Sequence, residues 1–337
     1  MGKKLFVLAA LLLLALPLLL APFGVDVRAY RTDARVASVS DDPLGYLADR
    51  MALRTAAITG RSRLLSLIGE SGSPQVIRGR EGFLFFAESI QEPPLTPAER
   101  ASLTEKLLAL ESALAADGRR LIVLIAPDKR SVYPELLPAN ILPEETDGLA
   151  LLNAEMTAAG LTVLDAQRLL TAGKGNGLLY FAGDSHWTAR GAGVVYRALM
   201  ALTGTADAPD YADVAFVPGT AGDLTLLCQP GTPPEEADAE PQIPRVYRTA
   251  RPMRTVDDAR IQTSSPTTDL SLLVVRDSFG RALFPYLANA CGRLTFSRSD
   301  KDVAGQAASA RADWIVVEVV QRNVRDWLVP GALISAE

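Results

Sequence analysis

The sequence predicts an α/β fold with a mostly parallel sheet. Two observations predict it: strand-like apolar segments alternate with helical patterns along the chain, and the segment 121–126 is apolar at every position. A strand that is apolar on both sides is typical of a parallel sheet covered by helices on each face. Hydrophobic residues make up 48% and charged residues 22% of the 337 residues, so the chain can bury a large core.

The N-terminus has the pattern of a membrane anchor. Lys3 and Lys4 precede an apolar run over residues 5–21. Such a run is longer than the apolar core of most cleaved signal peptides, about 7 to 15 residues, and near the lower limit for crossing a bilayer, about 17 residues. We therefore expect residues 1–23 to be an uncleaved anchor in the inner membrane, with a cleaved signal peptide as the alternative. The lysines should stay in the cytoplasm, which places the rest of the chain in the periplasm.

The next elements lead into one large domain. Residues 24–78 are charged and helix-prone and are expected to form a stalk before the domain, residues 79–337. An aromatic run at 83–86 predicts a strand or hairpin after a turn. A helix is expected over 96–117, because leucines recur there at three- and four-residue spacing and Gly118 follows.

Strands and helices are then expected to alternate along the domain. The remaining helices are expected at 149–159, at 188–202 and directly after Gly280. The remaining strands are expected at 162–164, 270–275, 294–296 and 314–320. Residues 203–268 interrupt the alternation with many Pro, Gly, Asp and Glu residues, so they are expected to form an insertion on the surface.

Charge and composition exclude several kinds of partner. The net charge is −5 and no Lys/Arg-rich run occurs, so nucleic acid is not expected to bind. Cys228 and Cys291 have neither the number nor the spacing of a structural zinc site, although they could form one disulfide in an oxidising compartment. With a single histidine and scattered acids, the chain offers no pair of ligands at helical spacing, so neither a metal nor a cofactor is expected.

Two short polar segments, residues 184–188 and 276–280, each follow the expected end of a strand and open a helix. Open α/β sheets build their sites at such strand ends. A serine in this kind of turn is exposed at the sheet edge, and the helix N-terminus supplies backbone N–H groups that can stabilise an oxyanion. We therefore expect the two segments to form one site.

Their side chains form a complete set for nucleophilic chemistry. A serine needs a base to become a nucleophile, and the base needs a carboxylate that orients it. His186 is the only histidine in the chain, so it is the expected base for Ser278, with Asp184 as the orienting carboxylate. The structural alternative makes Ser278 a helix N-cap and His186 a hydrogen-bonded loop residue.

These segments resemble the SGNH hydrolases and, more narrowly, the alginate O-acetyltransferase family of AlgJ and AlgX. The resemblance rests on residues 184–188, 276–280, 82–85 and the Pro-Asp-Lys and Tyr-Pro-Glu motifs within 126–138. It covers residues 79–337 and implies a three-layer α/β/α fold. Because the aspartate and histidine precede the serine, it also implies the circularly permuted order found in the alginate-type enzymes.

Four further residues are candidates for contacts with the oxyanion or the substrate. In the frame of the resemblance, Asn323 is the side-chain oxyanion donor, and a turn cap is the alternative. The other candidates are Gly280, Lys129 and Arg276, and for Lys129 a structural ion pair is the alternative. The segment 222–224 resembles a Gly-Asp-Leu motif of the same family, and it either lines the cleft or forms a plain turn.

The resemblance implies a serine-dependent O-acetyltransferase that works through an acetyl-serine intermediate. The acceptor would be a hydroxyl of an exported polysaccharide, alginate-like or another exopolysaccharide. The acetyl donor would be a separate multispanning membrane O-acyltransferase. Two alternatives stay open: a carbohydrate acetylesterase with the same three residues, and a noncatalytic polysaccharide-binding scaffold of an acetylation complex.

Overall fold

The computed structural model describes residues 60–65, 67, 71–141, 147–220, 222–229, 235–298 and 302–327. The anchor expected at 1–23 and residues 24–59 of the expected stalk lie outside these residues. Among the helices that are described, none has the length and apolar character that crossing a membrane requires.

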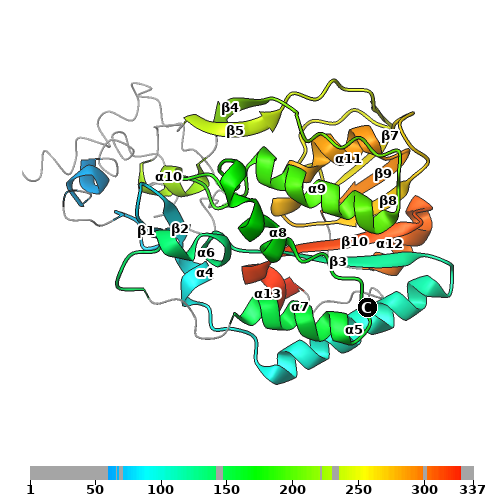
Figure 1. The fold of residues 1–337 in the computed structure, drawn as a ribbon, viewed down its shortest axis with the longest axis horizontal. Coiled ribbons are helices and arrows are strands. Elements are labelled where there is room, and N and C mark those ends of the chain that lie inside the picture. The colour runs from blue at the N-terminus through cyan, green and yellow to red at the C-terminus, as the bar shows by residue number, and fades with distance from the viewer. Residues whose placement is uncertain are drawn as a thin grey trace, which may run out of the picture.

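A six-stranded sheet in the order β3-β10-β8-β9-β7-β6 forms the centre of the molecule (Figure 1). Its strands are β3 (Arg120–Ala126), β10 (Trp314–Val320), β8 (Ser271–Val275), β9 (Arg293–Ser297), β7 (Arg260–Ser264) and β6 (Arg248–Thr249). The pairings from β3 to β9 are parallel, and β7 pairs antiparallel with both β9 and β6. The predicted α/β class is confirmed, and the sheet is mixed.

The central strands follow from their apolar sequence. Every residue of β3 after Arg120 is buried, and so is every residue of β8. β10 lies between them, with Trp314 opposite Arg120 and Val320 opposite Ala126. Strands buried on both faces need a helical layer on each side of the sheet.

Helices supply both layers, as Figure 1 shows. The helices on one face are α8 (Ala166–Gly173), α9 (Ala189–Thr203) and α11 (Phe284–Ala290). Those on the other face are α5 (Pro97–Ala115), α7 (Gly148–Ala158) and α12 (Val303–Ala310). Alternate β3 residues enter separate cores, since Ile122 and Leu124 pack with the first group and Leu121 and Val123 with the second. The three-layer α/β/α arrangement is therefore present.

The expected helices begin and end at capping residues. Thr96 caps α5 through a capping box with Glu99, and the leucines of α5 at positions 103, 107, 110 and 114 are buried. Thr188 caps α9 by accepting a hydrogen bond from the backbone of Gly191. Gly204 ends α9 with a φ of 69°, a left-handed conformation that favours glycine.

The short elements complete the domain. The aromatic run forms a hairpin, as expected, between β1 (Val76–Arg78) and β2 (Leu84–Phe86). The other short helices are α4 (Ala87–Gln91), α6 (Lys129–Val132), η2 (Pro134–Leu136), η3 (Lys174–Asn176), η4 (Phe279–Leu283), η5 (Gln321–Asn323) and α13 (Val324–Trp327).

Two sequence-based expectations differ from the structure. The strand expected at 162–164 is reduced to one parallel bridge between Val163 and Val123, because the chain turns directly into α8, which Asp165 caps. The stretch 203–268, expected to be a surface insertion, supplies β6 and β7 to the main sheet. It also contains a hairpin of β4 (Phe216–Thr220) with β5 (Glu235–Pro241), and α10 (Asp223–Cys228).

Cys228 and Cys291 are both free and buried. They belong to different clusters, because Cys228 packs against the hairpin of β1 and β2 whereas Cys291 lies in the core beneath α11. The disulfide left open from the sequence is therefore absent. Burial raises the pKa of Cys228 to about 11, so this thiol stays protonated at neutral pH.

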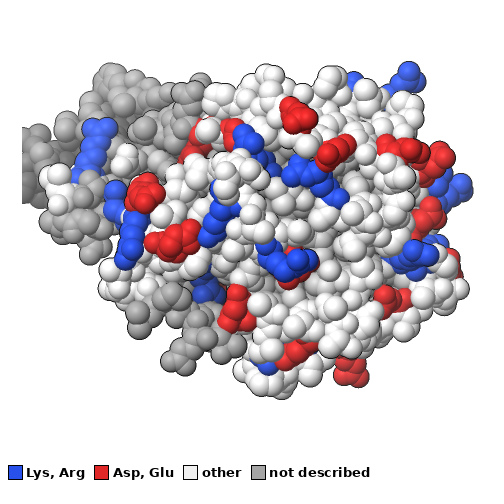
Figure 2. All heavy atoms as spheres, viewed as in Figure 1, with Lys and Arg blue, Asp and Glu red and all other residues white. Residues whose placement is uncertain are grey.

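Charged side chains are distributed evenly on the face drawn in Figure 2. Acidic and basic groups alternate over its described part, and no large patch of one sign gathers there.

Candidate active site

Ser278 lies in the turn between β8 and η4, at the carboxyl end of the parallel strands. Asp277 fixes this turn, because its Oδ1 accepts the backbone N–H of Phe279 at 2.9 Å and its Oδ2 accepts that of Val320 at 2.7 Å. Since Val320 ends β10, the aspartate ties the serine turn to the neighbouring strand. The backbone N–H of Ser278 has no hydrogen-bond partner among the described residues, so it can donate to an incoming group.

His186 lies in a loop rather than after a strand. This loop is closed by a single antiparallel bridge between Tyr180 and Trp187, and it leads into α9. The expectation that both polar segments follow strands therefore holds for Ser278 and is wrong for His186. The indole of Trp187 donates to the carbonyl of Phe279 at 2.9 Å and so joins this loop to the serine turn.

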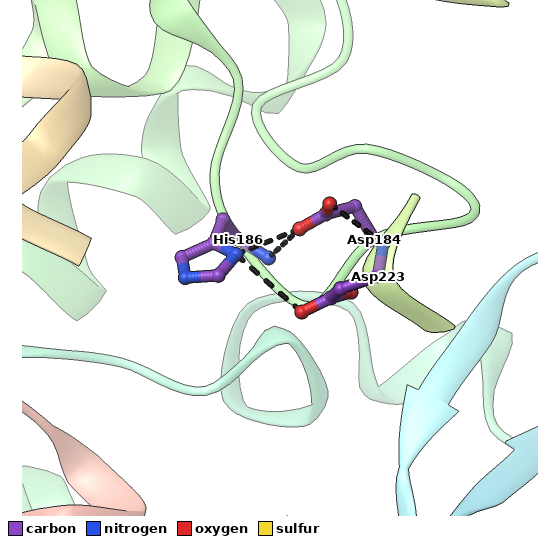
Figure 3. Close-up of side chains that lie close together, drawn as sticks. All are labelled: Asp184, His186 and Asp223. Carbon is purple, nitrogen blue, oxygen red and sulfur yellow. Dashed lines mark hydrogen bonds and ion pairs between the residues drawn. The ribbon is translucent and has the colours of Figure 1, made fainter. Parts of the chain in front are cut away.

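Ser278, His186 and Asp184 form one continuous chain of hydrogen bonds. Nε2 of His186 lies 2.9 Å from Oγ of Ser278. Nδ1 of the same ring lies 2.7 Å from Oδ1 of Asp184, and Figure 3 shows this second contact. The same Oδ1 accepts the backbone N–H of His186 at 2.9 Å, which fixes the loop between the two residues. The structure thus brings together the three side chains selected from the sequence, in the order nucleophile, base and carboxylate.

The charges around His186 favour its protonated form. Burial alone would lower the pKa of His186, but the carboxylates of Asp184 and Asp223 outweigh it and raise that pKa above its ordinary value. Burial would likewise raise the pKa of Asp184. The His186 ring and the backbone N–H groups that bind Asp184 instead hold its pKa well below the usual range. The ring is therefore a strengthened base next to an ionised aspartate.

The loop that carries Asp184 is supported by residues of the 203–268 stretch. The backbone N–H groups of Gly222 and Asp223 donate to Oδ2 of Asp184 at 2.7 and 2.9 Å. Glu236 on β5 accepts the backbone N–H of Gly183 at 2.6 Å. The Gly-Asp-Leu motif at 222–224 pointed to the contact of Gly222 and Asp223 with Asp184. Nothing in the sequence distinguished Glu236 from the other acidic residues of the 203–268 stretch.

Two of the four further candidates, Asn323 and Gly280, support the serine turn. Nδ2 of Asn323 donates to Oδ2 of Asp277 at 3.1 Å, so this amide holds the residue before the nucleophile. Gly280 allows close packing beneath the turn, because a Cβ there would lie 2.7 Å from Cβ of Arg276 and 2.8 Å from Oε2 of Glu318.

The other two candidates, Lys129 and Arg276, are buried and bind backbone carbonyls. Nζ of Lys129 donates to the carbonyls of Leu84 at 2.7 Å and Ala182 at 3.1 Å, which ties β2 to the start of the His186 loop. The Arg276 guanidinium donates to the carbonyls of Asp277 and Val256. Arg276 also lies 3.6 Å from a carboxylate oxygen of Asp257. The direct hydrogen-bond partners of Lys129 are carbonyls rather than the acid considered from the sequence, and contact of either side chain with substrate stays a prediction.

Arg322 reaches the site although the sequence analysis did not select it. Its guanidinium lies 5.1 Å from the centre of the Phe279 ring, and the centres of the Phe279 and His186 rings are 4.7 Å apart. Asp128 pairs with Arg322 at 2.5 Å. Because β3 and β10 are neighbouring parallel strands, the residues that follow them meet at one edge of the sheet. The positions of Asp128 and Arg322 directly after these two expected strands could have predicted that they lie close together.

One group of side chains near the site has ligand atoms of the kind that metals bind. Single atoms of Asp184, His186 and Asp223 lie within 4.8 Å of one another. His186 Nδ1 and Asp184 Oδ1 already share a 2.7 Å hydrogen bond, which a metal ion would have to displace. The present arrangement suits proton transfer through the ring.

Comparison with known proteins identifies relatives among acetyltransferases. A family model described as the SGNH hydrolase-like domain of acetyltransferase AlgX matches residues 76–267. A probable alginate O-acetylase AlgJ of Pseudomonas syringae pv. tomato is 28% identical over 134 residues, which cover 39% of this chain and 34% of the relative. The Pseudomonas putida protein of the same name is 31% identical over 136 residues, with 38% and 34% covered. The chain thus spans about a third of the length of these relatives.

Solved structures share the fold at low sequence identity. The O-acetyltransferase domain of Pseudomonas putida AlgJ has a TM-score of 0.50 at 19% identity, covering 74% of this chain and 92% of that domain. A DHHW family protein of Eubacterium siraeum has a TM-score of 0.58 at 12% identity, covering 74% and 95%. Bacillus cereus PatB1 with a sulfonyl adduct has a TM-score of 0.54 at 15% identity, covering 74% and 97%. Since the family match covers more than half of the chain, the protein belongs to the AlgX family of SGNH hydrolase-like acetyltransferases.

Proposed function

We propose that this protein is a serine-dependent O-acetyltransferase with Ser278 as nucleophile, His186 as base and Asp184 as orienting carboxylate. The observation that carries the proposal is the hydrogen-bonded chain of 2.9 and 2.7 Å that links the three side chains. The family match ends at residue 267, before Ser278, so the role of the serine rests on this geometry.

In the first half of the reaction, Oγ of Ser278 attacks the carbonyl carbon of an acetyl ester while His186 Nε2 takes the hydroxyl proton. The carbonyl oxygen becomes negative, and the unpaired backbone N–H of Ser278 can donate a hydrogen bond to it. His186 then gives its proton to the leaving oxygen. The products are the donor alcohol and acetyl-Ser278.

In the second half, a sugar hydroxyl attacks acetyl-Ser278 while His186 takes the hydroxyl proton. The bond from the acetyl carbon to Ser278 Oγ breaks, the proton returns to Oγ, and the acetyl group leaves on the sugar. Water in place of the sugar would release acetate instead, which is the acetylesterase reaction. The raised pKa of His186 suits both halves, because the ring must gain a proton in each.

The similarity to probable alginate O-acetylases supports a polysaccharide acceptor, alginate-like or another exopolysaccharide. The donor would be a separate multispanning membrane O-acyltransferase. The lysines and apolar run at the N-terminus support a place on the periplasmic side of the inner membrane.

The test measures acetyl transfer by the purified full-length protein. With a chromogenic acetyl ester as donor and an oligosaccharide as acceptor, we expect an acetylated sugar and, before the acceptor is added, a mass gain of one acetyl group on the peptide containing Ser278. Ser278→Ala should abolish both, whereas Ser112→Ala, an exposed serine on α5, should change neither. Free acetate without an acetylated sugar would indicate that the protein is an acetylesterase. No turnover by the unaltered protein would favour the alternative of a noncatalytic polysaccharide-binding scaffold.

A further inference from the structure

His186 Nδ1 faces a second carboxylate in addition to Asp184. Oδ2 of Asp223 lies 3.6 Å from Nδ1, compared with 2.7 Å for Oδ1 of Asp184. Figure 3 shows both carboxylates next to the same nitrogen, while the other ring nitrogen points away from them. Asp223 comes from the start of α10, which lies outside the loop that carries the other two residues.

Asp223 also holds the backbone of that loop. Its own N–H donates to Oδ2 of Asp184 at 2.9 Å. Its Oδ1 accepts the backbone N–H of Ser185 at 2.7 Å, and its Oδ2 accepts the Ser185 hydroxyl at 2.5 Å. One residue therefore fixes both Asp184, which orients the ring, and the residue between Asp184 and His186.

The ionised form of Asp223 is destabilised in this position unless a protonated His186 ring offsets its charge. Burial and the neighbouring carboxylate of Asp184 raise the pKa of Asp223, whereas a positive charge on His186 lowers it. An amide in this position could accept the backbone N–H of Ser185 through its oxygen, but its nitrogen could not accept the Ser185 hydroxyl, which would have to turn and accept instead. The negative charge itself is favourable only when His186 carries a proton, which happens during attack by Ser278.

Two cations also face this group. Arg322 on η5 lowers the pKa of His186, and Lys129 on α6 is buried close enough to interact with both aspartates. Arg322 opposes protonation of the ring, as burial does, so the two carboxylates must outweigh both effects. Asp184 is held in place for this task by two backbone N–H groups, one from Asp223 itself and one from Gly222.

We propose that Asp223 is a positioning residue of the proposed reaction, a second carboxylate that holds the Asp184 loop and stabilises the protonated His186 ring. The inference rests on the proposed function, since it assigns a role in the same site. It predicts that removing the charge of Asp223 changes the titration of His186 as well as the rate.

The test compares Asp223→Asn with the unaltered protein and with Asp213→Asn, which removes an exposed carboxylate from the same 203–268 stretch. We expect Asp223→Asn to lower kcat/KM by at least about tenfold, because the neutral amide does not stabilise the positive charge that develops on the His186 ring in the transition state. Because His186 acts in its neutral form, the acid limb of the pH profile should move to lower pH. Asp213→Asn should leave both unchanged, and Ser185→Ala, which keeps the charge, should leave the position of the acid limb unchanged.

The single histidine allows a direct measurement that does not depend on turnover. In tag-free protein, the ring proton signals of His186 report its pKa by NMR. We expect a lower pKa in Asp223→Asn than in the unaltered protein. An unchanged pKa would overturn the inference even if the rate fell, since a purely structural role predicts that result. If Asp223→Asn does not fold, the same pKa measurement on Asp223→Ser replaces it.

The proposed function can fail separately. Equal turnover by Ser278→Ala and the unaltered protein would refute the proposed function, whereas the pKa difference measured by NMR would remain valid.

Discussion

Lys129→Met should change how the stability of this protein depends on pH. The Lys129 ammonium is 4% exposed, and its direct contacts among the described residues are neutral: the carbonyls of Leu84 and Ala182 and the rings of Phe83 and Phe85. The charges of Asp184, Asp223 and Glu236 offset only part of the effect of burial on its pKa. Burial lowers the pKa of Lys129 from its ordinary value of 10.5 to about 8. The folded protein therefore loses this proton at a lower pH than the unfolded chain does.

The sign and size follow from this difference. Below pH 8 both states hold the proton, so Lys129 contributes no pH dependence. Between pH 8 and 10.5 the unfolded chain binds more protons, so the free energy of unfolding rises with pH. A difference of two to three pKa units corresponds to about 3 kcal/mol at pH 10.5.

Urea unfolding at a series of pH values from 7 to 10.5 measures this contribution. The free energy of unfolding of the unaltered protein minus that of Lys129→Met should rise across this range, and subtraction removes the titration of the buried thiols and phenols. Lys174→Met, at a partly exposed lysine that pairs with Glu135, is the matched control, and its difference should not rise across this range. A flat or falling difference for Lys129→Met would refute the reasoning.

Two further substitutions test the site and its support. Asp184→Asn should lower kcat on the order of 10⁴-fold in the acetyl transfer assay, because the amide cannot stabilise a protonated His186 ring; a loss below tenfold would contradict this role. Gly280→Ala should lower the free energy of unfolding by about 1 to 3 kcal/mol, since its Cβ would lie 2.7 Å from Cβ of Arg276, whereas Gly175→Ala, with open space around it, should cost far less. Equal midpoints of urea unfolding for the two alanine variants would show that the turn absorbs the methyl group.

The predictable parts of the fold are those in which local pattern and tertiary environment agree. The apolar runs of β3 and β10 are strands because both faces are covered, and the leucines of α5 are spaced for one buried face. β7 was missed because its five residues include Arg260 and Gln262, and only alternate positions are buried. Its context, rich in Pro, Gly and acids, is typical of loops, so only pairing with β9 reveals it as a strand.

The candidate site likewise has parts that the sequence predicts and parts that depend on the tertiary structure. Choosing His186 needed no structure, because a serine nucleophile requires a base and the chain has one histidine. The target of the Asn323 amide could not be predicted, since the amide can donate to an oxyanion or to a carboxylate. One of its donations goes to Asp277, whose position between Val320 and Asn323 depends on the pairing of β8 with β10. The predicted donation to an oxyanion stays a prediction, since the amide nitrogen carries two hydrogens.

The two halves of the site are therefore held by different kinds of structure. Ser278 follows a fully buried strand, and Asp277 bonds its turn to the end of β10, so displacing the nucleophile would disrupt the central sheet. His186 lies in a loop whose supports, Asp223 and Glu236, come from α10 and β5, outside that sheet. Among the described residues β5 pairs only with β4, whereas β10 pairs on both sides. Opening of the part that contains β4, α10 and β5 should therefore cost less free energy than opening of the central sheet. Such opening would separate the base from the serine without unfolding the domain. The proposed activity should therefore depend on residues 216–241, which contain β4, α10 and β5, more than global stability does.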